Sequence, residues 1–115
     1  MKESPAFTRT YDLVRWLIPL TIKFPRPHRF VLAASLQRTV LLLQEQLLEA
    51  ALSTQPQPFL RRADITLAKL RLYLRLCRDL ELMSLGQYAH GARLMAEVGR
   101  LLGGWLKKES ELTQS

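Results

Sequence analysis

The chain has 115 residues, which is enough for the hydrophobic core of one domain and too short for two. Leucine, arginine, alanine and glutamine are frequent while glycine and β-branched residues are sparse, so the composition favours an all-α fold over a sheet. Seventeen Lys and Arg against ten Asp and Glu give a formal net charge of +7, which favours a polyanionic partner such as nucleic acid or an acidic protein surface.

Proline and polar segments divide the chain into four predicted helices. Each of Pro25 and Pro27 disfavours helix in the residue before it, so 24–29 is expected to be extended, and the Pro/Gln segment 53–58 makes a second break. Ser84 and Gln87 have the spacing of a capping box, which marks the start of the last helix. The predicted helices cover residues 6–23, 30–53, 60–82 and 84–108.

The short connections between these helices favour antiparallel neighbours. They predict an antiparallel up-and-down four-helix bundle that forms one domain over residues 1–115. Residues 109–115 are polar and are expected to fray at the end of the last helix.

The second and third helices carry more apolar surface than one bundle needs. A core-facing stripe is about 100° wide or somewhat more, and leucines in both helices spread beyond it. This surplus predicts burial against other subunits, that is, a homo-oligomer. The additional residues are Leu41, Leu42, Leu48 and Leu52 in the second helix and Leu72, Tyr73, Leu76 and Leu80 in the third.

The last helix contains a narrow stripe of small residues that includes Gly99 and Gly103, with Trp105 in an apolar wall beside it. A glycine inside a helix costs about 1 kcal/mol relative to alanine. The stripe therefore predicts that Gly99 and Gly103 lie at a close contact with another helix, in the same chain or in a neighbouring subunit.

The third predicted helix carries a basic stripe. Arg71, Arg75 and Arg78 have i, i+4, i+7 spacing and project from one face within roughly 10 Å of helix axis. Like charges so close together repel each other, and a bound polyanion would relieve this repulsion, so the stripe predicts a polyanion-binding face. Lys69 of the same helix is a further candidate for this binding. The alternative is a solvated or ion-paired face, with acids of adjacent helices opposite the arginines: Glu45, Glu49 or Glu97.

The proline-containing loop adds Lys23, Arg26 and Arg29 as further candidates for nucleic-acid or partner binding. Contact with phosphates needs only exposed cationic donors, so these patches imply affinity without base specificity. Stacking of bases on Tyr73 or Tyr88 is the less favoured interpretation, because both lie at apolar positions that suit packing.

Patterns typical of catalysis are missing from the sequence. His28 and His90 have no Cys, Asp or Glu at metal-ligand spacing, and Glu45 with Glu49 suit a surface pair. The single cysteine, Cys77, lies in a helical apolar pattern and is expected to be a buried, unreactive thiol. We therefore expect no catalytic residues, no metal and no cofactor.

The first thirty residues carry six cations and no uninterrupted apolar segment, so no secretory signal is predicted. No run approaches the roughly 18 apolar residues of a membrane span. These features predict a soluble cytoplasmic protein without a membrane partner.

Four segments, read together, resemble one family. The chain is similar over about residues 7–108 to Avd, the accessory variability determinant of diversity-generating retroelements, within a wider group of four-helix bundles that includes proteins encoded in ribosomal RNA intervening sequences. The last segment is the most specific of the four, which are Tyr11-Asp12, Phe24-Pro25-Arg26 through Arg29-Phe30, residues 63–76, and Ala96-Glu97-Val98-Gly99-Arg100-Leu101-Leu102-Gly103-Gly104-Trp105.

The resemblance implies a basic homopentamer that associates with the reverse transcriptase of the retroelement. It would bind RNA and DNA with little sequence preference and support mutagenic cDNA synthesis without catalysing it. Arg71 and Arg75 match the basic pair of the family in the third helix, whereas the tail with Glu109 and Glu111 departs from a further basic run. The alternative is a structural or interaction bundle that docks on acidic protein surfaces, as in the intervening-sequence relatives.

Overall fold

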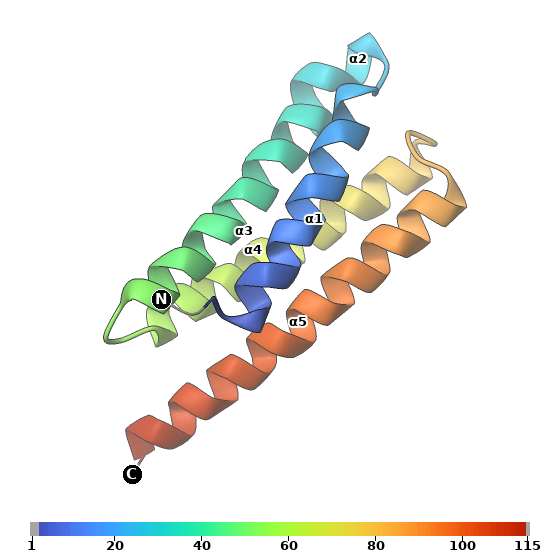
Figure 1. The fold of residues 1–115 in the computed structure, drawn as a ribbon. Helices are drawn as coiled ribbons and strands as arrows, with labels where there is room; N and C mark the ends of the chain where they lie inside the picture. The colour runs from blue at the N-terminus through green and yellow to red at the C-terminus, as the bar shows by residue number, and fades with distance from the viewer. Residues whose placement is uncertain (1–2, 115) are drawn as a thin grey trace.

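A computed structural model describes residues 3–114, and residues 1, 2 and 115 at the ends of the expected domain lie outside this range. Four long helices run through the described part of the chain: α1 (Pro5–Ile22), α3 (Ala34–Leu52), α4 (Gln57–Asp79) and α5 (Leu85–Gln114). A single helical turn, α2 (Arg26–His28), and a π-helical segment, η1 (Arg29–Ala33), join α1 to α3. The predicted all-α four-helix bundle is confirmed (Figure 1).

Each long helix packs beside the next one in the sequence, and α1 closes the ring against α5. The pairs α1 with α4 and α3 with α5 lie on the diagonals. The bundle is elongated, with extents of 51 × 22 × 21 Å. Its long helices alternate in direction, as the short connections predict (Figure 1).

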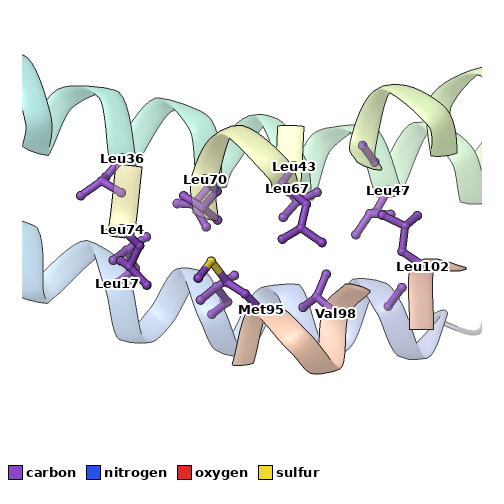
Figure 2. Packing of buried hydrophobic residues seen from close by; sticks show 14 of the residues in the cluster. Leu17, Leu36, Leu43, Leu47, Leu67, Leu70, Leu74, Met95, Val98 and Leu102 are labelled. Atoms are coloured by element: carbon purple, nitrogen blue, oxygen red, sulfur yellow. The ribbon is translucent and has the colours of Figure 1, made fainter. Parts of the chain in front are cut away.

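The core is a column of leucines along the axis of the bundle (Figure 2). All four long helices contribute to it at the expected spacing of three or four residues. Fully buried members are Leu13, Leu17, Leu36, Leu43, Leu47, Leu60, Leu67, Leu70, Leu74 and Leu102.

Polar side chains fix two of the helix starts. The Ser4 hydroxyl accepts a hydrogen bond of 3.1 Å from the Phe7 amide at the start of α1. Before α5, the Gln87 amide donates to the Ser84 hydroxyl (3.0 Å), and the Ser84 amide donates to the Gln87 side-chain oxygen (2.8 Å). The predicted capping box is therefore present, and it gives hydrogen-bond partners to two amides at the start of α5.

The expectation that 24–29 is extended was wrong for most of this segment. Pro25 has extended backbone, with φ −54° and ψ 146°, but the helical turn of α2 begins at the next residue and η1 follows it. Pro27 fits in this turn because proline in the first turn of a helix removes only an amide that has no partner there. The same tolerance lets α4 begin at Gln57, three residues earlier than expected, with Pro58 in its first turn.

The last helix is longer than the sequence pattern indicated. Its expected end was near residue 108, whereas α5 continues to Gln114 and includes the polar residues expected to fray. The side chain of Ser110 packs back on the bundle and accepts a hydrogen bond of 3.1 Å from the Gln57 side chain at the start of α4. This contact extends the packing of α5 on α4 past the last apolar residues that the sequence pattern assigned to the helix.

The surplus apolar side chains of α3 and α4 are exposed in the single chain, apart from Tyr73, which is half-buried against the core. The exposed set is Leu41, Leu42, Leu48, Leu52, Leu72, Leu76 and Leu80, each with 40–65% of its surface accessible. No helix within residues 3–114 is long and apolar enough to cross a membrane.

Candidate nucleic-acid interface

The predicted basic stripe lies along the side of α4 that is next to α5. Arg71 extends across the neighbouring helix, so that its guanidinium nitrogen Nη2 occupies the space where a Cβ on Gly99 would project. Leu67 also approaches this point, at 3.5 Å from the position of such a Cβ. The group next to Gly99 is therefore chiefly the end of the Arg71 side chain and not the backbone of another helix, so the predicted close helix contact at Gly99 stays a prediction.

Arg71 and Arg75 are exposed and are not neutralised by a carboxylate. The ion pairs within 4.0 Å among residues 3–114 join Arg9 to Asp12, Arg78 to Asp79 and Arg100 to Glu97. Arg71 and Arg75 take part in none of these pairs. Arg71 and Arg75 lie one turn of helix apart, so both side chains start from the same face of α4.

Arg78, the third member of the predicted stripe, is engaged within the chain. Its guanidinium pairs with the Asp79 carboxylate at 2.9 Å and lies over the Tyr88 ring, 4.7 Å from its centroid. Tyr88 is thus occupied by an arginine of α4 rather than open to a base. The available basic surface on this side is centred on Arg71 and Arg75.

The acids that the ion-paired interpretation placed opposite the stripe lie elsewhere. Glu97 is bound to Arg100 on its own helix at 2.7 Å, and the hydrogen bond from Arg100 lowers the pKa of the Glu97 carboxyl. Glu45 and Glu49 are exposed on α3 and have no ion pair among the described residues. Arg71 and Arg75 therefore keep their charges uncompensated.

The other basic candidates lie on different surfaces. Lys69 is exposed, but two residues of helix place it on nearly the opposite side of α4 from Arg71. The loop residues Lys23, Arg26 and Arg29 are exposed at the end of the bundle where α1 meets α3 (Figure 1). The structure therefore separates the sequence candidates into the Arg71 and Arg75 face of α4, Lys69 on the other side of that helix, and a patch at the α1–α3 end.

The small-residue stripe of α5 only partly matches its prediction. A Cβ on Gly103 would meet nothing within 4 Å, so the close contact expected for Gly103 is absent within this chain. The tightest contact with packed apolar side chains is instead at Gly91, which the sequence pattern did not single out. There a Cβ would lie 2.8 Å from Leu74 Cδ2 and 2.9 Å from Trp16 Cη2.

Trp105 packs against the core at the joint between α5 and the start of α1. It lines a cleft of about 410 Å³ together with Pro5, Leu101 and Gly104, and with the charged residues Arg100, Lys108 and Glu109. This cleft lies on the side of α5 that faces α1, whereas Arg71 reaches α5 from the α4 side. Trp105 therefore belongs to helix packing and is separate from the basic face.

The chemistry of the remaining candidate groups is limited. Cys77 is fully buried, and desolvation by burial raises the pKa of its thiol to about 11, as expected for an unreactive cysteine. In the described part of the chain, no three His, Cys, Asp or Glu side chains gather closely enough to hold a metal ion.

Fold and surface together define a basic four-helix bundle with an unpaired arginine pair on one face. The model of the bAvd-like family matches residues 6–109. The chain therefore belongs to the bAvd-like family, and this membership supports an accessory protein of a diversity-generating retroelement. Comparison with curated proteins found no match.

Proposed function

We propose that this protein is a non-catalytic accessory subunit of a diversity-generating retroelement. It binds the reverse transcriptase and holds RNA and DNA through phosphate contacts, with little sequence preference, while the polymerase makes mutagenic cDNA. Membership of the bAvd-like family supports the accessory role. The formal charge of +7 supports a polyanionic partner.

The single observation that carries nucleic-acid binding is the uncompensated pair Arg71 and Arg75 on the α4–α5 face. A guanidinium group presents a planar fork of donors that matches phosphate oxygens. Two such forks one helical turn apart follow a backbone without reading base edges.

In this proposal the protein assembles as a homopentamer, in which neighbouring subunits cover the exposed leucines of α3 and α4. Static light scattering at micromolar concentration is expected to give a mass close to five times the 13.3 kDa of one chain. The physical reason is the broad apolar surface of the single chain, and the number five follows from the family resemblance. A mass of one chain would show that these leucines remain in contact with water.

Changing Arg71 and Arg75 together to glutamine is expected to weaken binding to all nucleic-acid sequences alike. The slope of log affinity against log salt should fall by about two, because each arginine neutralises about one phosphate. The measurement is a salt titration of binding to two oligonucleotides of unrelated sequence, by wild type and by the double variant.

The matched control changes Arg15 and Arg38 to glutamine. These two arginines are exposed on α1 and α3 and form no ion pair within residues 3–114, so the control removes the same charge from other faces. Its salt slope should stay close to that of wild type. Equal slopes for all three proteins would show that Arg71 and Arg75 do not contact phosphates.

A second candidate function is docking on an acidic protein surface alone. It is favoured by exposed Leu72 and Leu76, which lie on α4 among Lys69 and Arg75 and suit a protein interface. Binding of the purified protein to its reverse transcriptase after nuclease treatment, with no affinity for free oligonucleotides, would support this alternative over the nucleic-acid function.

A further inference from the structure

Phe30 is the most exposed large hydrophobic side chain among the described residues, with 82% of its surface accessible. It lies at the end of the bundle where η1 joins α1 to α3. Large aromatic side chains are usually buried in a protein of this size, because burying one removes 150–250 Å² of apolar surface from water. An aromatic ring left in solvent is therefore a candidate contact for a ligand.

The local backbone holds the ring outward. In η1, Leu32 and Ala33 are inserted into the core, with 7% and 3% of their surfaces accessible, while the preceding residues Phe30 and Val31 remain outside. The π-helical geometry of this segment is uncommon in proteins and is frequent at functional sites. Phe30 is thus presented by a structured turn anchored in the core.

Three cations come shortly before Phe30 in the sequence and are exposed. Lys23, Arg26 and Arg29 are exposed and make no ion pair with a carboxylate in the described part of the chain. Arg29 donates from Nε to the Phe24 carbonyl oxygen at 2.9 Å, which fixes its stem and leaves both terminal nitrogens free to donate. The end of the bundle therefore combines an exposed aromatic ring with three exposed positive charges, of which that of Arg29 has its stem held in place.

We propose that this patch, formed by Phe30, Lys23, Arg26 and Arg29, binds single-stranded nucleic acid by stacking an unpaired base on Phe30 while the cations contact the flanking phosphates. Stacking platforms beside cationic residues are the usual means by which proteins bind single strands without reading sequence. A duplex has its bases stacked on each other and offers no free base face, so this site prefers single strands. The proposal rests on the proposed function and adds a second surface to the α4–α5 face.

The test compares Phe30→Leu with Phe30→Trp. Leucine keeps an apolar side chain and removes the aromatic face, whereas tryptophan keeps and enlarges that face. For an oligonucleotide of mixed sequence, Phe30→Leu is expected to weaken single-strand binding about 5- to 100-fold and to leave duplex binding within about twofold of wild type. Phe30→Trp should bind single strands at least as tightly as wild type, with fluorescence quenching beyond that of the native tryptophans Trp16 and Trp105.

Val31→Ala is the matched control, because it removes an exposed apolar side chain that is not aromatic from the same turn. Its affinity for single strands is expected to be that of wild type. Circular dichroism of each variant checks that the bundle is intact. An equal loss for single strands and duplexes in Phe30→Leu would overturn the stacking proposal.

Failure of this inference is distinguishable from failure of the proposed function. If Phe30→Leu binds single strands like wild type while the Arg71 and Arg75 double variant does not, the stacking site is wrong and the proposed function stands. If wild type binds no nucleic acid at all, both are wrong. If Phe30→Leu loses only its reverse-transcriptase partner, the patch is a protein-docking surface and the inference is overturned.

Discussion

Replacing Gly91 by leucine is expected to lower the free energy of unfolding by about 1–3 kcal/mol, because it overpacks a closed contact between three helices. A Cβ at this position would already lie within 3.0 Å of Leu74 on α4 and of the Trp16 ring on α1. Leu74 is fully buried, and the half-buried Trp16 ring contacts His90 of α5 with ring centroids 5.2 Å apart, so moving either side chain away disturbs existing packing. Urea denaturation of the variant measures the loss.

Alanine substitutions on the same helix provide the control. Gly91→Ala should destabilise the protein, whereas Gly104→Ala should stabilise the single chain by about 1 kcal/mol, because alanine favours helix and nothing lies within 4 Å of its Cβ. Opposite signs for the two variants would separate packing from helix propensity. Equal stabilisation by both would show that the space around Gly91 opens easily.

Leu70→Ala is expected to cost about 2–5 kcal/mol of stability, the range for large-to-small changes in a closed core. Leu70 is fully buried on α4 and lies within the leucine column (Figure 2). Its removal takes apolar atoms out of the column and leaves a cavity that rigid neighbours fill only partly. The readout is the midpoint and slope of urea unfolding.

Leu72→Ala is the matched variant, two residues further on the same helix. Leu72 is 55% exposed in the single chain, so its truncation should cost less than about 1 kcal/mol in the folding of the bundle itself. In the proposed pentamer it should instead shift the mass measured by light scattering towards smaller species. A loss of unfolding free energy as large as that of Leu70→Ala would contradict the assignment of these two side chains to core and surface.

The fold could be predicted from the sequence because its signals are local. The leucine spacing identifies the core side of each helix, and Ser84 with Gln87 identifies one helix start from neighbouring residues alone. The segment 24–29 was mispredicted because a residue before proline only tends to avoid helical backbone. A proline in the first turn of a helix fits without losing a hydrogen bond, and this allows the turn at Pro27.

The candidate site could be predicted only in part. Helical spacing places Arg71 and Arg75 on one face, but whether an acid lies opposite them depends on how the helices are arranged around the axis. The same limit applies to the glycines, because a helical wheel ranks residues by direction and does not show which neighbour they meet. Gly103 follows the small-residue pattern, yet a Cβ there would have no neighbour within 4 Å. Gly91 does not belong to the predicted stripe, yet a Cβ there would lie against Trp16 and Leu74.

The ring of helices closes at the joint between α1 and α5, where Trp16 contacts His90 and the start of α1 borders the cleft beside Trp105. The other three joints connect helices that follow each other in the chain, so they form with short loop closures. The α1–α5 joint brings together the two long helices that lie farthest apart along the chain. Until α5 packs against them, α1 and α4 expose leucines of the core to water, so in the proposed homo-oligomer the closing of this joint comes before contact between subunits.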